Sequence, residues 1–318
     1  MIREELFKSR HFRLQEIIDG VFAAIAIPGT GAMGNAGIVD LGNRTLVFDT
    51  FYTPQAARDL RNAAEQIFQR PVTLVVNSHG HADHMLGNQE FPDASIIATD
   101  QTRQMIHERG TALLEFIKSN PGYPDKFALQ IEEEVDKSKR EQMLTTLGDY
   151  REFGKAVPTL KVTYPNIIFE NEITFYGTKR NAKLITYGGG HTKSDAFLYL
   201  PGEKIAFMGD LLTVQSHNQC FHGDAEEFVR ILKRVEQLQI DVAIPGHGEV
   251  GQMKDIKTMR EYFEEVVNQL NNLIENGVPL EKGITVQGPK KYSSWNIPDL
   301  FDRNIRLLLE QKLSKDIV

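Results

Sequence analysis

One short segment, Asn77–His84, constrains the fold of this chain more than any other. It holds three imidazoles and one carboxylate, and it follows an apolar run that predicts a buried strand ending in a loop. Alternate residues of an extended loop project to the same side, so His79 and His81 form one pair, while Asp83 and His84 lie further round the turn. Imidazole and carboxylate are the ligands of a hydrolytic zinc site, so the segment predicts part of a metal centre.

A histidine-rich surface loop is the competing interpretation of this segment. The chain contains nine histidines in 318 residues, and three of them lie here. This clustering favours the metal-site interpretation. Because ligands so close together in sequence cannot all reach one metal unaided, other parts of the chain should supply partners.

Three further candidate ligands lie later in the chain, each after an apolar segment and beside glycine. They are His191 after Gly190, Asp210 after Gly209, and His247 after Gly246. Glycine lets the backbone turn sharply or approach a ligand closely. Each residue alone is a weak signal, and the argument rests on their combination.

Taken in order, the candidates resemble the motif set of the metallo-β-lactamase superfamily, which is an aspartate, then HxHxDH, then His, Asp and His. Asp49 matches the leading aspartate, and the resemblance spans roughly residues 15 to 250. The resemblance implies His79, His81 and His191 on one metal, Asp83, His84 and His247 on the other, and Asp210 bridging them. Two Zn²⁺ are the expected cofactors, with Mn²⁺ or Fe²⁺ as alternatives. Asp49 would support the ligands without binding a metal.

The N-terminal part of the chain is rich in strand-like segments. Residues 17–27, 36–41 and 45–49 are apolar, and the Gly42–Asn43 pair predicts a hairpin between the last two. Thr53 as N-cap and Pro54 at the first helical position predict a helix that ends before Pro71. The metal loop then follows a strand at its C-terminal end, where open α/β sheets usually bind ligands.

A second strand-rich part carries the remaining candidate ligands. Its expected strands cover residues 167–169, 173–176, 183–187, 196–200, 204–208 and 241–244. Asp224 predicts a capping box before an amphipathic helix. Two strand-rich halves with helices predict an α/β fold, and the family resemblance implies a four-layer αββα sandwich of two mixed β-sheets.

The interval between His84 and His191 is too long for a simple connection within a compact domain. Residues 100–157 are charged and helix-periodic, which predicts an inserted helical segment within a single domain of residues 1–318. We expect this segment to form a lid or pocket wall, with a dimer contact as the alternative. Residues 255–318 are expected to form a C-terminal helical extension.

Composition limits the classes of partner. A net charge of −7 and a pI near 5.8 argue against a broad nucleic-acid face. The single cysteine, Cys220, cannot form an intramolecular disulfide. Residues 1–10 lack the apolar core of a signal peptide, and no apolar run is long enough to span a membrane. We therefore expect a cytoplasmic protein that does not enter a membrane; a homodimer is one option for its oligomeric state.

These observations predict a binuclear metal-dependent hydrolase in which Asp83 and Asp210 are the catalytic carboxylates. Two Zn²⁺ carry four positive charges, and two carboxylates with one bound hydroxide leave about one, which favours anionic transition states. The metal-bound hydroxide would attack a small-molecule ester, lactone, thioester or β-lactam.

Two other functions use related motifs. A phosphodiesterase or nuclease of the same superfamily has the same motif set, so the ligands alone do not separate it from a small-molecule hydrolase. A non-hydrolytic di-iron redox protein usually has glutamate where this chain has His81, which argues against that function.

A loop of residues 215–223 follows Asp210 and holds further polar residues. His217, Asn218 or His222 could line the pocket, but a structural role is the stronger expectation. Cys220 lies ten positions beyond Asp210 and is not counted as a ligand. Tyr292 and Trp295 are expected to pack in the core or at a dimer contact.

Overall fold

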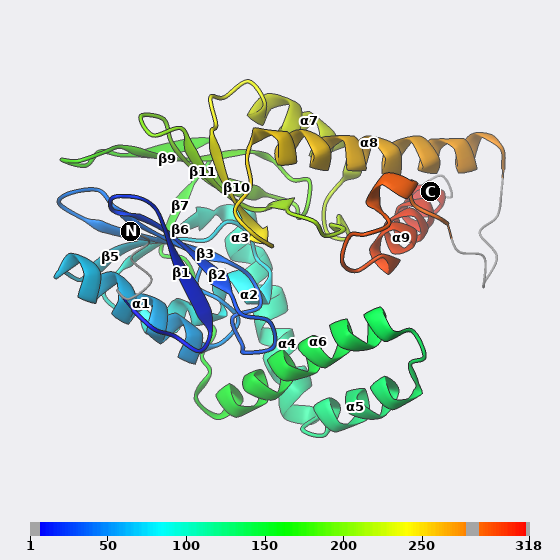
Figure 1. Ribbon diagram of the computed structural model, residues 1–318, viewed down its shortest axis with the longest axis horizontal. Coiled ribbons are helices and arrows are strands. Elements are labelled where there is room, and N and C mark those ends of the chain that lie inside the picture. The colour runs from blue at the N-terminus through cyan, green and yellow to red at the C-terminus, as the bar shows by residue number, and fades with distance from the viewer. Residues whose placement is uncertain (1–6, 278–285, 316–318) are drawn as a thin grey trace.

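The computed structural model describes residues 7–277 and 286–315. Two mixed β-sheets pack face to face, with helices on both outer sides, so the predicted sandwich is confirmed (Figure 1). The first sheet contains, in spatial order, β1 (Phe12–Ile18), β2 (Val21–Ala26), β3 (Ala36–Asp40), β4 (Thr45–Phe48), β5 (Val72–Val76), β6 (Ser95–Thr99) and β7 (Ile167–Phe169). The second contains β12 (Val242–His247), β11 (Ile205–Thr213), β10 (Asp195–Leu200), β9 (Ala182–Gly188) and β8 (Glu172–Phe175).

The strand directions explain where the ligands lie. Strands β1 to β4 are antiparallel and β4 to β7 are parallel, whereas only β11 and β12 are parallel in the second sheet. The expected hairpin at Gly42–Asn43 joins β3 to β4. Strands β3 and β4 are buried along their whole length, as strands covered on both faces must be. Gly37 is required where the sheets meet, because a Cβ there would collide with the ring of Phe207.

Apolar layers hold the sandwich together. Between the sheets, the rings of Phe48 and Phe207 pack at a tilt, with their centroids 5.7 Å apart, within one buried cluster. On the outer face of the first sheet lies α1 (Pro54–Phe68), capped by Thr53 as predicted. The second sheet is covered by α7 (Ala225–Val235) and α8 (Met253–Glu275), and α9 (Asp299–Lys315) packs against α8 (Figure 1). Part of the expected C-terminal extension, residues 278–285 and 316–318, lies outside the described residues.

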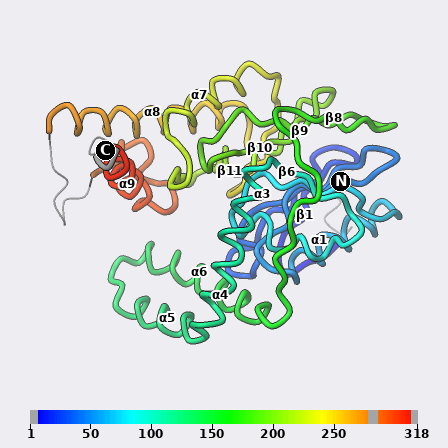
Figure 2. Tube along the Cα trace, turned by 180° about the vertical axis from the view of Figure 1, so that it is seen from behind, coloured from blue at the N-terminus to red at the C-terminus, as the bar shows by residue number. Residues whose placement is uncertain are grey.

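The segment between β6 and β7 is helical, as predicted. It comprises α3 (Asp100–Met105), the π-helical turn η2 (Ile106–Gly110), α4 (Thr111–Ser119), α5 (Tyr123–Glu133), α6 (Lys137–Ala156) and η3 (Val157–Thr159). Helices α4 to α6 project to one side of the sandwich (Figures 1 and 2). They are attached by a Tyr52–Phe153 stack at 4.5 Å and by Asp149, whose carboxylate accepts the Gly31 N–H at 2.8 Å.

Two local predictions were wrong in detail. The strand expected over residues 17–27 is a hairpin of β1 and β2, which turns at Gly20 with φ +78°. Its first strand was missed because most of its residues are only half-buried and many are polar. Asp224 caps α7 by accepting the Glu227 N–H, but the Glu227 side chain pairs with Arg230 instead of closing a capping box. No helix within residues 7–277 and 286–315 combines the length and apolar character of a membrane span.

Candidate metal centre

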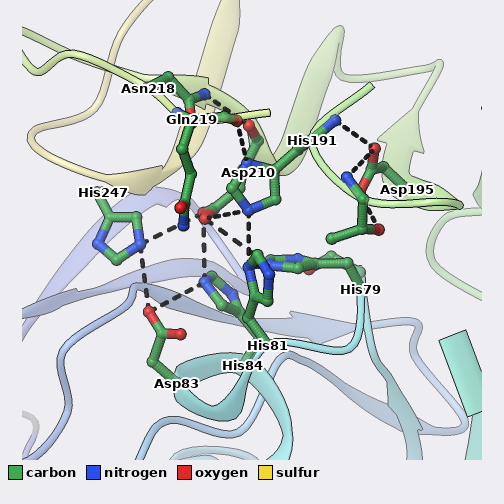
Figure 3. Close-up of polar contacts among 12 residues, drawn as sticks. His79, His81, Asp83, His84, His191, Asp195, Asp210, Asn218, Gln219 and His247 are labelled. Atoms are coloured by element: carbon green, nitrogen blue, oxygen red, sulfur yellow. Dashed lines mark hydrogen bonds and ion pairs between the residues drawn. The ribbon is translucent and has the colours of Figure 1, made fainter. Parts of the chain in front are cut away.

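The seven predicted ligands come together in two groups (Figure 3). The members of the first group are His79, His81, His191 and Asp210, and those of the second are Asp83, His84 and His247. Within each group, the possible ligand atoms lie within 4.8 Å of one another. The division of the HxHxDH segment into two pairs therefore agrees with the structure.

Asp210 lies between the groups and directs one oxygen to each. Its Oδ2 is 3.1 Å from His191 Nε2 and 3.8 Å from His79 Nε2. Its Oδ1 is 3.2 Å from His84 Nε2 and 3.4 Å from His247 Nε2. This is the arrangement of a carboxylate that can bridge two cations.

Strand ends and short turns position the histidines. Strand β5 ends just before Asn77, His81 is the N-cap of α2 (Ala82–Met85), and His84 lies within that helix. His191 follows β9 in a loop held by Asp195, whose Oδ2 accepts the Gly190 and His191 N–H groups at 2.8 Å each. Asp195 was not predicted from the sequence, although its carboxylate fixes a ligand loop.

In two ligand rings, the outer nitrogen, Nδ1, which points away from the metal centre, also has a partner. His84 Nδ1 lies 2.8 Å from Asp49 Oδ2, and His191 Nδ1 donates to the Gln219 carbonyl at 2.8 Å. Asp49 also accepts the Ser78 hydroxyl and N–H at 2.7 Å each. Such contacts fix the orientation of a metal-binding ring. The supporting position expected for Asp49 agrees with this geometry.

The backbone before α1 is strained beside these contacts. Asp49 has φ +57° and Phe51 has φ +67°, both in the left-handed region that residues with side chains rarely adopt. Both side chains are fully buried. Such conformations persist where the surrounding structure holds them, commonly at functional sites.

The residues fit a metal centre better than a network of hydrogen bonds. His81 Nδ1 lies 3.0 Å from His79 Nε2 and 2.8 Å from His191 Nε2, so three ring nitrogens converge. His84 Nε2 and Asp210 Oδ1 are buried and form no hydrogen bond. Nitrogen and carboxylate ligands in this arrangement suit a divalent transition metal. The two clusters are therefore consistent with a metal site.

Comparison with known proteins identifies the family. The model of the metallo-beta-lactamase superfamily matches residues 29–247. The chain belongs to the metallo-β-lactamase superfamily. The motif resemblance and the fold it implied are thus confirmed.

Two curated proteins resemble different lengths of the chain. The α subunit of 2,4-dinitroanisole O-demethylase from Nocardioides sp. (strain JS1661) is 35% identical over 102 residues, which are 31% of this chain and 27% of that protein. Metallo-beta-lactamase type 2 from Bacillus cereus is 24% identical over 240 residues, which cover 73% of this chain and 72% of that protein. The chain thus spans about a quarter of the first relative and most of the second.

Solved structures of the superfamily share the fold. A metallo-beta-lactamase from Pontibacter korlensis aligns with a TM-score of 0.56 at 16% identity, over 80% of this chain and 99% of that one. The structure of TMB-1 aligns with a TM-score of 0.59 at 14% identity, over 82% of this chain and 100% of the TMB-1 chain.

The charges of this superfamily site are unevenly divided between its two groups. Burial and the neighbouring imidazoles lower the pKa of His79 and His81 well below the usual value, so these rings are neutral and free to bind a metal. Burial opposes a charge on His247, but Asp210 and Asp83 outweigh it and raise the His247 pKa to about 10. The metal-free second group is therefore a paired set of opposite charges, from which a metal must displace protons.

A cavity of about 800 Å³ opens onto the metal centre. His81 and Asp83 line it, together with Tyr52 and with Leu113 and Phe116 of α4. The helical segment thus contributes side chains to this cavity. Whether it moves as a lid stays a prediction.

The loop after β11 differs in part from its prediction. His217 lies in the core, 3.2 Å from both the Tyr262 hydroxyl and the Tyr292 carbonyl, so it does not line the pocket. Asn218 donates to the main-chain carbonyl of Asp210 at 2.8 Å, and Cys220 is buried. The structural role expected for these three residues agrees with their contacts.

His222 of the same loop does reach the site. Its Nδ1 lies 2.9 Å from His81 Nε2, and the ring borders the cavity. Burial and the charge of Arg109 lower its pKa to about 4. Sequence spacing does not distinguish His222 from His217, because only the fold of the loop turns one toward the metals and the other toward the core.

Tyr292 packs against Trp295 in that core.

Proposed function

We propose that this protein is a hydrolase that uses two transition-metal ions, Zn²⁺ foremost, to cleave a small-molecule ester, lactone, thioester or β-lactam. The observation that carries the proposal is the position of Asp210, which directs one carboxylate oxygen to each ligand group. Family membership supports a hydrolase, and the two ligand groups support a binuclear centre.

The ligand set determines the charge of the loaded centre. His79, His81 and His191 would hold one ion, Asp83, His84 and His247 the other, with Asp210 between them. Bound Zn²⁺ polarises carbonyl oxygens and lowers the pKa of water to about 7, which supplies hydrolytic chemistry at neutral pH. Because Asp83 and Asp210 contribute only two negative charges, the site stays net positive and favours an anionic transition state.

The surrounding residues favour a small molecule over nucleic acid. The cavity has apolar and aromatic walls that include Met33, Leu113 and Phe116, which suit a compact, partly apolar substrate. The net charge of −7 disfavours a polyanion. One relative's name gives a small aromatic compound, 2,4-dinitroanisole, which supports the same class, although the match covers 31% of this chain.

A hydrolysis panel on metal-loaded protein tests this proposal. Lactones, thioesters, carboxylic esters and a chromogenic β-lactam should include at least one substrate whose cleavage stops on chelation and returns with Zn²⁺. Phosphodiesters and structured RNA serve as the comparison. Cleavage of only the phosphorus-containing substrates would replace the proposal with a phosphodiesterase, and cleavage of none would remove the hydrolase.

A further inference from the structure

Two cavities meet beside the candidate metal centre. The first, of about 800 Å³, borders His81 and Asp83. The second, of about 600 Å³, is lined by residues of α3 and of the loops after β9 and β11 and includes none of the seven candidate ligands. Both are lined by Glu108, Arg109 and His222. A substrate with its reacting bond at the metals could therefore extend one end to this junction.

The contact with His81 determines what His222 offers to the junction. His81 turns Nδ1 toward the ligands His79 and His191, and its Nε2 lies 2.9 Å from His222 Nδ1. A neutral ring that binds a metal through one nitrogen carries its proton on the other, so His81 donates to His222. His222 then carries its own proton on Nε2, on the far side of its ring from His81. It thus presents a hydrogen-bond donor whose orientation is fixed by a metal ligand.

Arg109 supplies a charge at the same place. Its side chain lines both cavities together with His222, and it forms no ion pair or hydrogen bond with any residue in the ranges 7–277 and 286–315. It belongs to the π-helical turn η2, a rare form that is frequent at functional sites. Glu108 adds one negative charge beside it. One cation, one neutral donor and one anion suit a singly charged ligand better than a phosphate dianion.

We propose that Arg109 and His222 bind a carboxylate of the substrate at the junction of the two cavities. This assignment rests on the proposed hydrolase function and narrows its substrates to small molecules with an acidic end. Leu113, Phe116 and Tyr52 line the cavity that joins the junction to the metals. An aryl or alkyl group between the carboxylate and the scissile bond would therefore meet an apolar wall.

Calorimetric binding of phenylacetate to the metal-loaded protein tests the subsite directly, with neutral phenylacetamide as the paired probe. Arg109→Gln should weaken phenylacetate about tenfold, the size expected for a lost charge-assisted hydrogen bond, and leave phenylacetamide unchanged. Glu108→Gln should strengthen phenylacetate. Lys118→Gln is the matched control, because it removes a positive charge from the same helical segment at a residue that borders neither cavity. Equal phenylacetate affinity in the wild type and in Arg109→Gln would mean that the metals alone bind the carboxylate, which overturns the proposal.

Substitution of His222 tests the connection to His81 through metal affinity, without using activity. His222→Ala should weaken one metal site about tenfold or more, as loss of a ligand's hydrogen-bond partner does. His222→Gln should restore much of this affinity, because its amide oxygen can accept from His81 while its N–H₂ can still donate to a carboxylate. Wild-type metal and phenylacetate affinities in His222→Ala would overturn the assignment.

The hydrolysis panel separates failure of this assignment from failure of the proposed function. Hydrolysis of neutral esters together with an unchanged phenylacetate affinity in Arg109→Gln rejects the carboxylate subsite and retains the hydrolase. Arg109-dependent phenylacetate binding without hydrolysis of any panel member retains the subsite and rejects the hydrolase.

Discussion

The metal loops and the helical segment between β6 and β7 border the same cavity but are held in place very differently. His79, His84 and His191 are at most 1% exposed, and the outer nitrogen of each ring contacts a neighbouring oxygen. By contrast, α4 has no fully buried residue and α5 has one, Ile131. The ligand rings are thus fixed by burial and by neighbouring oxygens, whereas α4 and α5 are largely exposed, so we expect α4 and α5 to accept substitutions that leave the ligands in place. Under the proposed function, the ligand loops would supply the chemistry, and α4 would contribute to the choice of substrate.

The largest effect should come from the carboxylate shared by both ligand groups. Asp210→Asn keeps the side-chain volume but removes the charge directed to both metals, so metal content should fall and hydrolysis should drop about a hundredfold or more. Elemental analysis and kcat/KM measure the two effects, and circular dichroism should remain that of the wild type. Two tightly held metals and full turnover would show that Asp210 does not bridge.

Asp83→Asn should affect one ligand group only. Asp83 Oδ2 lies 3.2 Å from His247 Nε2 and 3.4 Å from His84 Nε2, so its charge belongs to the second group. We expect one metal to weaken about tenfold to a hundredfold while the other is retained. Chelator titration with two resolved steps would measure this, and equal weakening of both metals would contradict the grouping.

Changes in the helical segment should alter substrate binding and leave the metals in place. Phe116 is 45% exposed and lines the cavity, so Phe116→Ala should raise KM severalfold for substrates with an apolar group and leave kcat nearly unchanged. Leu129→Ala is the matched control, because Leu129 is exposed on α5 and does not line this cavity. Loss of metal in Phe116→Ala would show that the two regions are not independent.

The smallest effect concerns the attachment of the helical segment. Burial raises the pKa of Asp149 to about 6, above its usual value of 3.8. The Asp149 carboxyl group therefore binds its proton more tightly in the folded state than in the unfolded state. Protonation of Asp149 thus stabilises the fold fully below about pH 4, and this stabilisation is lost as the pH rises through 6. Asp149→Asn stays neutral and still accepts the Gly31 N–H.

Denaturant unfolding of metal-free protein measures this effect. Above pH 6, Asp149→Asn should raise the free energy of unfolding by roughly 1 kcal/mol, allowing for solvent screening, and near pH 4 it should match the wild type. A variant that is less stable at every pH would mean that the carboxylate charge stabilises the contact with Gly31.

The sequence predicted the two pairs of the HxHxDH segment because their spacing is local, whereas the resemblance to the superfamily implied the assignment of His191, Asp210 and His247. His79, His81, Asp83 and His84 lie within six consecutive residues of one loop, and the strand before it determines which side each faces. The sequence did not identify Asp195 or the proposed role of Arg109, and it did not separate His222 from His217, because these contacts arise only when separate loops and the π-helical turn pack together. The first strand, Phe12–Ile18, was missed for a related reason, since its half-buried residues show no clear alternation.

The metal content of the reconstituted protein tests the central claim most directly. Wild-type protein is loaded with Zn²⁺, freed of excess metal and analysed for zinc per chain. The two ligand groups sharing Asp210 predict close to two ions per chain, and their removal should abolish hydrolysis. One ion or none in fully folded protein would contradict a binuclear centre.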